Sequence, residues 1–205
     1  MAACIISDQP GGLTAVPGFQ VSATAADVRE NGQERLDLAL LRNTGPQFTA
    51  AAVFTQNDIK AAPVVQGARA LKSSSGQCQA ILMNSGNANA CTGPEGFQDN
   101  KRLVEAVAQA LSLPLDQVLI SSTGRIGRRL PIDRMEAAVT GLVQSLSNGP
   151  EQGRKASEAI LTSDTRPKTV TVTTEIQGKA ITLSGMAKGA GMIQPDMATM
   201  LAYVA

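Results

Sequence analysis

The chain has 205 residues, with 18 basic and 17 acidic side chains, one Tyr, no Trp and no His. Because like charges form no block and aromatic side chains are scarce, the composition argues against nucleic acid or a membrane as a partner. The absence of histidine excludes, within this chain, a Ser-His-Asp triad, a Cys-His pair and any His-dependent zinc site. Acyl-transfer chemistry would therefore need a lysine, a carboxylate or an α-amine as its base.

The cysteines and the apolar runs predict a cytoplasmic protein without a metal site. Cys4, Cys78 and Cys91 are odd in number and lack CxxC spacing, so we expect reduced thiols rather than a disulfide framework. Cys91 has no base beside it in the sequence and is expected to be a small buried residue. The apolar run at residues 2–6 is too short for a signal peptide, and no run approaches the ~20 apolar residues of a membrane helix.

Hydrophobic periodicity predicts a mixed α and β chain that forms one domain or a tightly joined pair, after a loop at residues 1–18. Strands are expected at residues 19–28, 36–41, 48–55, 79–83, 118–120, 168–175 and 180–183, with an extended segment at 61–65. Helices are expected at residues 68–72, 98–111, 131–146 and 151–161. This order favours an α/β or α+β layered sandwich in which helices 98–111 and 131–146 cover a sheet face.

The last eighteen residues, from Lys188 to Ala205, join a glycine-rich loop to an Ala-Thr pair and an apolar run. The run after Ala198 is typical of a buried strand. Cleavage before Thr199 would place its hydroxyl beside its own free α-amine, which combines a nucleophile and a base on one residue. A loop that simply leads into a core strand explains the same stretch, so both interpretations stay open at this point.

Three further polar stretches are expected in loops at the ends of strands or helices, where chemistry is often found. Residues 84–93 could orient a polar ligand, or could satisfy their own backbone through Asx-turns. Residues 121–127 place hydroxyls before a glycine, as an oxyanion or phosphate cradle requires, but lack P-loop spacing. Residues 162–165 form another hydroxyl cluster after a helix.

Taken together, these stretches form a specific pattern: NSGNANACTG, SSTG followed by IG, LTSDT followed by PK, and KGAGMIQPDMATML, in this order. Over nearly its whole length the chain thereby resembles the bifunctional ornithine acetyltransferases (glutamate N-acetyltransferases) of arginine biosynthesis. The resemblance implies a layered αββα sandwich, similar in outline to the N-terminal-nucleophile hydrolases but connected differently. It also implies an α chain at residues 1–198 and the start of a β chain at residues 199–205.

The same resemblance implies autocleavage between Ala198 and Thr199. The freed Thr199 would take the acetyl group of N2-acetylornithine and pass it to glutamate through an acetyl-threonine intermediate. An α-amine titrates near ~8, closer to neutrality than a lysine, so it suits the role of base in a chain without histidine. Thr123 and Gly124 match the pair that forms the family's oxyanion hole.

Thr162, Lys188 and Thr199 match the family's substrate-binding positions. The resemblance implies no cofactor, with acetyl-CoA as an alternative acetyl donor, and a β chain from the same precursor in an α2β2 heterotetramer. Most of that β chain is missing here, so this chain alone should not complete an active site, and a non-catalytic fragment or subunit is the alternative. Arg125 and Arg166 stand where the family commonly has apolar residues, and each would either shift substrate preference or face solvent.

Overall fold

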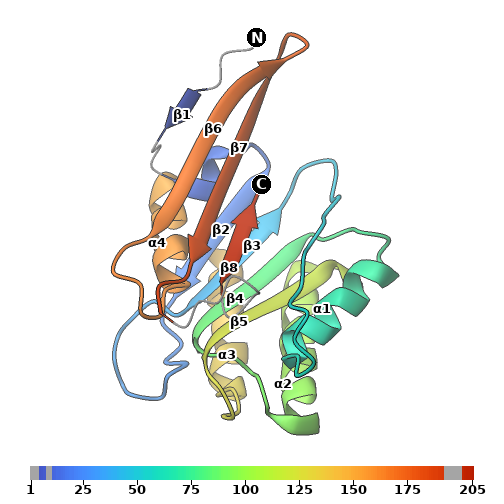
Figure 1. Ribbon diagram of the computed structural model, residues 1–205, viewed down its shortest axis with the longest axis vertical. Helices are drawn as coiled ribbons and strands as arrows, with labels where there is room; N and C mark the ends of the chain where they lie inside the picture. Colours follow the sequence, from blue (N-terminus) through green and yellow to red (C-terminus); the bar gives the residue numbers. More distant parts are fainter. Residues whose placement is uncertain (1–4, 8–10, 192–199) are drawn as a thin grey trace.

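Two four-stranded sheets stacked face to face form the frame of the protein (Figure 1). The computed structural model describes residues 5–7, 11–191 and 200–205. The first sheet has the strand order β2 (Phe19–Thr24), β3 (Leu38–Asn43), β4 (Ala80–Asn87) and β5 (Val118–Arg125). The second has the order β1 (Ile5–Ser7), β6 (Lys168–Ile176), β7 (Lys179–Lys188) and β8 (Leu201–Val204). All neighbouring strands are antiparallel except β4 and β5, which are parallel.

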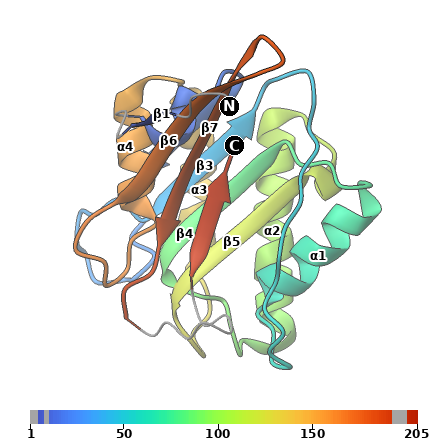
Figure 2. The ribbon, with the colours of Figure 1, turned by 45° about the horizontal axis from the view of Figure 1, so that its top comes forward.

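Helices cover the first sheet on the side away from the second sheet (Figures 1 and 2). The helices are α1 (Ala62–Ser73), α2 (Gly93–Leu111), α3 (Ile132–Gln144) and α4 (Pro150–Ala159), with short 3₁₀ turns η1 (Gly12–Ala15) and η2 (Leu115–Gln117). Helices α1, α2 and α3 lie on the covered side, whereas α4 and η1 pack near β2 and β3 on the other face. None of the helices in the described part is both long enough and apolar enough to span a bilayer.

The alternation of side chains along β3 divides the interior into two cores. Leu38 and Leu40 point to one face and pack against the apolar stripes of α2 and α3. Leu41 points to the other face, where it packs with α4 and with Met186 and Tyr203 from the second sheet. The strand is apolar throughout because both of its faces are buried by this chain.

The second sheet buries only one of its faces within the described residues. Met186 and Tyr203 are a cross-strand pair that faces the first sheet. On the opposite face, Val170 is exposed, Leu183 is 48% exposed and Val204 is 76% exposed. No described helix packs on this outer face. The described layers are therefore helix, sheet and sheet, and the predicted class, a layered mixed α/β fold, is confirmed.

Most predicted elements are present with shifted ends, and three predictions are wrong. Residues 1–18 are not a loop throughout, because they contain β1, which pairs with β6, and the 3₁₀ turn η1. The segment 48–55 forms no strand, because only Thr49 makes an isolated bridge, with Gln77, and Val53 is 89% exposed. The segment 61–65 is not extended beyond Ala61; α1 begins at the next residue, with Pro63 in its first turn. Proline is tolerated there because the first helical N–H groups have no partner within the helix.

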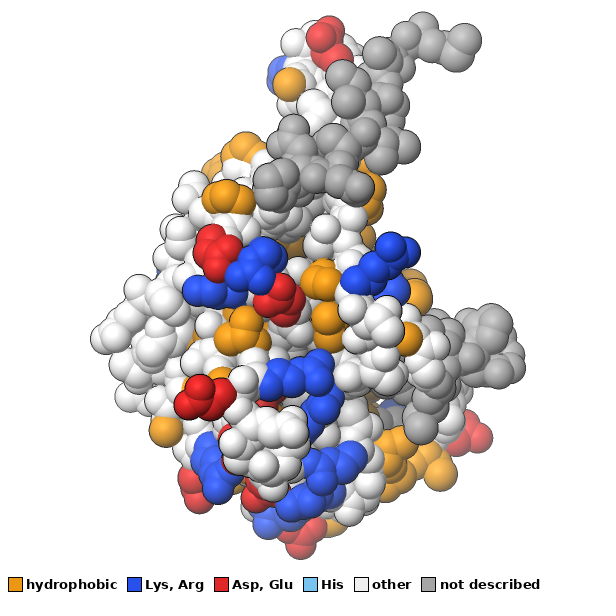
Figure 3. Space-filling model, turned by 90° about the vertical axis from the view of Figure 1, so that its left-hand side faces the viewer, with side chains coloured by type: hydrophobic (Ala, Val, Ile, Leu, Met, Phe, Trp, Pro, Cys, Tyr) orange, Lys and Arg blue, Asp and Glu red, His pale blue; other side chains and the backbone are white. Residues whose placement is uncertain are grey.

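Charged side chains of both signs lie interspersed on the side of the molecule that carries α4 (Figure 3). On α4 itself, Arg154 pairs with Glu151 at 2.7 Å and with Glu158 at 2.5 Å. These pairs lie three and four positions apart, as neighbours on a helix surface do. On α4, therefore, side chains of opposite charge are paired with one another rather than gathered by sign.

Candidate active site

Two of the polar stretches lie side by side as the ends of the parallel strands β4 and β5. Strand β4 runs through Asn87 and β5 through Arg125, with Ser85 opposite Thr123 and Gly86 opposite Gly124. The prediction that these stretches are loops was wrong for residues 84–87 and 121–125, because the ladder between β4 and β5 pairs their backbone groups whatever their side chains are. The consequence is that the candidate oxyanion pair, Thr123 and Gly124, is held by a sheet.

Glycine is required where the two strand ends meet. Gly86 and Gly124 have φ values of 105° and 135°, which residues other than glycine rarely adopt. A Cβ atom on Gly124 would overlap the backbone of Gly86 and Asn87. The ladder is also irregular at Gly86 and Asn87, where a bulge turns the chain. Backbone atoms therefore approach one another more closely here than any other residue type allows.

Lys188 and Thr123, two of the predicted site residues, meet between the two sheets. The ammonium of Lys188, at the end of β7, donates a hydrogen bond of 3.0 Å to Oγ1 of Thr123 on β5. Thr123 is fully buried and Lys188 is only 3% exposed. Burial lowers the pKa of Lys188 below the usual lysine value, while the negative charge of Asp164 opposes this shift. The pair places a desolvated cation directly behind the hydroxyl of Thr123.

Thr162, the third predicted residue, is held by a carboxylate that the sequence did not single out. The Oδ2 atom of Asp164 accepts from the N–H of Thr162 at 3.3 Å, and Oδ1 accepts from the N–H of Gly189 at 2.7 Å. Oδ1 also accepts from Nζ of Lys168 at 2.5 Å. Asp164 thereby ties the segment after α4 to the residue that follows Lys188. Its place inside the LTSDT motif was the available signal.

The electrostatics of Asp164 follow from these contacts. Burial by itself would raise its pKa, but the hydrogen bonds from Lys168, Gly189 and Thr162 outweigh burial and lower the pKa to about 2. The carboxylate is therefore charged at neutral pH and keeps its three partners in place.

Two arginines also hold the segment around Thr162. Arg29 donates to the carbonyl of Thr162 at 3.4 Å, and Arg35 donates to the carbonyl of Leu161 at 2.7 Å. Arg125 is exposed to solvent, which was one of the two alternatives predicted for it. It also donates a hydrogen bond to the carbonyl of Arg29. Arg166 is exposed to solvent.

The two residues of the predicted cleavage site, Ala198 and Thr199, lie outside the described residues. The strand that follows them in sequence, β8, pairs with β7 so that Leu201 is opposite Lys188. Strand β8 is also tied to the first sheet, because the hydroxyl of Tyr203 donates to Oγ of Ser121 at 2.7 Å. Burial raises the pKa of Tyr203, so its hydroxyl stays protonated. The predicted strand after Thr199 is thus present, but of its four residues only Tyr203 is buried, so the expected burial was wrong for the others.

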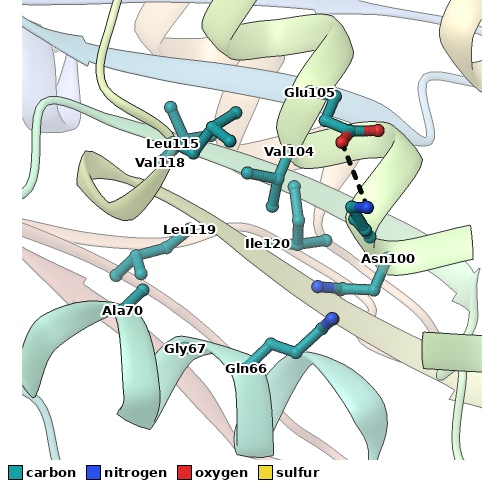
Figure 4. A pocket seen from close by; sticks show the side chains of 11 residues that line it. Gln66, Gly67, Ala70, Asn100, Val104, Glu105, Leu115, Val118, Leu119 and Ile120 are labelled. Atoms are coloured by element: carbon teal, nitrogen blue, oxygen red, sulfur yellow. Dashed lines mark ion pairs between the residues drawn. The ribbon is translucent and has the colours of Figure 1, made fainter. Parts of the chain in front are cut away.

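A separate cavity of about 150 Å³ lies between α1, α2 and β5 (Figure 4). Gln66 and Asn100 extend toward each other across it, and their amide oxygens are buried without a hydrogen-bond partner. Apolar side chains such as Val104 and Ile120 form much of the remaining wall. None of the predicted site residues lines this cavity, so it is distinct from the site at the sheet junction.

Cysteines and acidic residues do not build a second site in the described part of the chain. Cys78 is buried and free, and its pKa is raised to about 11 by burial. Cys91 is free but exposed, so the prediction that it is buried was wrong. Within residues 5–7, 11–191 and 200–205, no group of three potential metal ligands comes together.

Comparison with known proteins places this geometry in one family. The family model described as "ArgJ family" matches residues 20–205. The chain is 47% identical over 195 residues to the arginine biosynthesis bifunctional protein ArgJ of Mycobacterium leprae, covering 93% of this chain and 46% of that protein. It is 48% identical over 189 residues to the protein of the same name from Streptomyces avermitilis, covering 92% of this chain and 47% of the relative. The chain thus spans about half the length of these curated relatives.

Solved structures agree with the sequence match. The ArgJ protein of Bacillus halodurans has a TM-score of 0.88 at 32% identity, covering 98% of this chain and 100% of the other. The ornithine acetyltransferase of Mycobacterium tuberculosis, crystallised with ornithine, has a TM-score of 0.85 at 40% identity, covering 97% of this chain and 100% of the other. The family match, the relatives and the shared fold agree, and the chain belongs to the ArgJ family.

Proposed function

We propose that this chain supplies the α chain, residues 1–198, and the first residues of the β chain of an acetyltransferase. The enzyme would move the acetyl group of N2-acetylornithine to glutamate, with the remaining β chain as its partner in an α2β2 heterotetramer. The observation that carries the proposal is the buried contact of Lys188 with Thr123, next to Gly124 and opposite the strand that follows Thr199. It supplies a polar, desolvated setting for an oxyanion in a chain without histidine.

The first half-reaction starts from Thr199 after cleavage of the Ala198–Thr199 bond. Its hydroxyl oxygen attacks the acetyl carbonyl of N2-acetylornithine while its α-amine accepts the hydroxyl proton. The tetrahedral intermediate carries a negative oxygen, which accepts hydrogen bonds from the Thr123 hydroxyl and the Gly124 N–H. Collapse of the intermediate breaks the C–N bond, the α-amine returns the proton to the leaving nitrogen, and ornithine departs. The acetyl group is then an ester on Thr199.

The second half-reaction reverses the order with a new amine. The nitrogen of glutamate attacks the ester carbonyl, the same donors hold the oxyanion, and the Thr199 oxygen leaves with a proton. N-acetylglutamate and free Thr199 result. Acetyl-CoA would serve as an alternative donor in the first half if its thioester reaches the same carbonyl position.

Lys188 has a physical role in this scheme beyond charge. A threonine hydroxyl has one hydrogen to donate and lone pairs that accept. Because Thr123 Oγ1 accepts from Lys188, its own hydrogen is left to donate to the oxyanion. Direct contact of Lys188 and Thr162 with the substrate stays a prediction from the resemblance.

The proposal is tested in the full-length protein, in which this chain is joined to the remaining half seen in its relatives. Acetyl transfer to glutamate is measured with N2-acetylornithine and, separately, with acetyl-CoA as donor. We expect transfer with the first donor and none in a Thr199→Ala variant, which should also remain uncut. A Thr199→Ala variant that still cuts itself and transfers acetyl would refute the assignment of the nucleophile.

The outer face of the second sheet favours a second candidate, a subunit fragment that binds its partner chain without turnover. Val170, Leu183 and Val204 expose apolar surface there, as expected for a face that another layer covers. Expression of residues 1–205 alone would then give aggregated protein that becomes soluble when the remaining half is co-expressed. Acetyl transfer by the co-expressed pair would decide for the enzyme.

A further inference from the structure

Three guanidinium groups converge beside the candidate site. Arg29 and Arg35 lie in the connection between β2 and β3 and reach the carbonyls of Thr162 and Leu161. Arg125 comes from the end of β5, directly after Gly124, and reaches the carbonyl of Arg29. We call Arg29, Arg35 and Arg125 the arginine cluster. Its members lie far apart in the sequence and are brought together only by the fold.

The arginine cluster has more positive charge than its surroundings balance. Within the described residues, none of its three members forms an ion pair with a carboxylate. Two arginines nearby do: Arg128 pairs with Glu30 at 2.6 Å, and Arg134 pairs with Asp27 at 2.7 Å. The members of the cluster are therefore distinguished from their neighbours by donating to backbone carbonyls instead.

Asp37 is the acidic group that acts on Arg29, and it is already occupied. Its two carboxylate oxygens accept from the N–H groups of Ala26 and Val28, each at 2.7 Å. The pKa of Arg29 is nevertheless lowered, first by burial and then by the positive charges of Arg35 and Arg125. Arg29 is thus acted on by two neighbouring cations and one carboxylate, and an additional anion would relieve the repulsion among the cations.

The arginine cluster also lies where a substrate would have to bind. A Cβ atom on Gly86 would come within 2.5 Å of Cγ of Arg29, so the side chain of Arg29 lies directly over Gly86. Gly86 is opposite Gly124 in the ladder, and the guanidinium of Arg29 contacts the Thr162 carbonyl. Arg29 therefore spans the space between the candidate oxyanion pair and the segment that carries Thr162.

We propose that the arginine cluster binds a carboxylate group of the substrate. The inference rests on the proposed acetyl transfer and assigns it a carboxylate subsite. Each guanidinium has five N–H donors in a planar fork that matches a carboxylate, and each member is seen to use one of them. Glutamate and ornithine share an α-carboxylate, and glutamate has a second carboxylate in its side chain. Arg125 makes the cluster more cationic than the apolar residue expected at this position would.

Capping of the carbonyls after α4 is the structural role that the same arginines would play without a ligand. If the arginines only cap these carbonyls, a variant should lose stability, and its affinities for glutamate and for ornithine should both be unchanged. A carboxylate site predicts the reverse for Arg125, which is the exposed member and contacts no carbonyl after α4. Affinity and unfolding temperature, measured on the same variants, therefore separate the two roles.

The test is calorimetric binding of L-glutamate and of L-ornithine to the full-length protein, without any acetyl donor. We expect Arg125→Gln and Arg29→Gln to weaken binding about tenfold or more, as loss of a hydrogen bond to a charged group does. Arg29→Lys should restore part of the affinity because it restores the charge. Arg128→Gln, which removes a cation already paired with Glu30, should bind as the unmodified protein does.

The two amino acids identify which carboxylate is bound. Weaker binding of glutamate alone supports recognition of its side-chain carboxylate, and weaker binding of both supports recognition of the shared α-carboxylate. Unchanged affinity for both in Arg125→Gln and Arg29→Gln would overturn the inference. Because no acetyl group is present, this result is independent of turnover: absence of acetyl transfer would contradict the proposed function while leaving the binding result to stand.

Discussion

The two sheets each contain four strands but differ in what covers them. The β2-β3-β4-β5 sheet is buried on both faces by this chain. Along its inner strand β3, Leu40 points toward the helices and Leu41 points toward the second sheet. The β1-β6-β7-β8 sheet is buried on its inner face only, and Leu183 on its outer face is 48% exposed. The candidate site joins the two, with Thr123 from the first and Lys188 from the second. One half of the site is thus set by a closed core, and the other half depends on a sheet whose outer face is open in the described part.

The largest effect is expected from Gly124→Ala, in the closed sheet. The added Cβ overlaps the backbone of Gly86, and a φ of 135° is strained for alanine. We expect a loss of roughly 3 kcal/mol or more in the free energy of unfolding, measured by urea denaturation. Gly127→Ala is the matched control, since its φ is also positive, at 76°, but open space surrounds it. It should cost only about 1 kcal/mol, and equal losses would show that the strand ends are not closely packed.

A pair of leucine truncations compares the two sheets directly. Leu40→Ala removes a fully buried side chain from the closed sheet and should cost about 2–5 kcal/mol. Leu183→Ala removes a side chain that is already half in water and should cost less than about 1 kcal/mol. Both values come from denaturant unfolding of residues 1–205 at a protein concentration low enough to keep the chain in solution. A large loss for Leu183→Ala would mean that its face is covered in solution, for instance by a second copy of the chain.

Lys188→Met tests the contact between the sheets with a side chain of similar length. Loss of the donor to Thr123 should reduce acetyl transfer by about 10²–10³-fold, as loss of oxyanion stabilisation does. Stability should change little, because the substitution replaces a buried cation with an apolar group. Lys179→Met, at the exposed start of the same strand, is the control and should keep full activity. Normal transfer by Lys188→Met would remove Lys188 from the account.

A smaller effect than that of Lys188→Met is expected from Asp164→Asn, and it depends on pH. The pKa of Asp164 is lowered to about 2 from an ordinary value of 3.8. A lowered pKa in the folded state stabilises the protein at pH values above 3.8, and that stability is lost as the pH falls toward 2. The difference in unfolding free energy between the original protein and the variant should therefore be constant near neutrality and shrink between these two pH values. A difference that does not change over this range would show that the charge of Asp164 has no stabilising role.

Elements with a clear period could be predicted from the sequence, and those set by distant contacts could not. The buried apolar residues of α2 and α3 recur at helical spacing, so the sequence predicts both helices. The segment 48–55 has the composition of a strand but pairs with a neighbour only at Thr49, which bridges Gln77. Pro63 indicated an extended segment locally, whereas the chain uses it to begin a helix.

The candidate site divides in the same way. Thr123, Gly124, Thr162 and Lys188 stand in stretches whose order suggested a family, and the fold brings Thr123 and Lys188 into contact. Of the arginine cluster, only Arg125 could be singled out from the sequence; its grouping with the others had no local signal, because Arg29 and the Thr162 carbonyl are 133 positions apart. Contacts of that separation follow from strand order and layer packing, which no short motif encodes.

The central claim is that the Lys188–Thr123 contact serves an acyl transfer carried out by Thr199. Mass spectrometry of the full-length protein mixed with N2-acetylornithine, before and after addition of glutamate, tests it most directly. The account predicts a β chain that begins at Thr199, carries one acetyl group on that residue, and loses it when glutamate is added. An uncut chain, or an acetyl group found on Lys188 instead of Thr199, would contradict it.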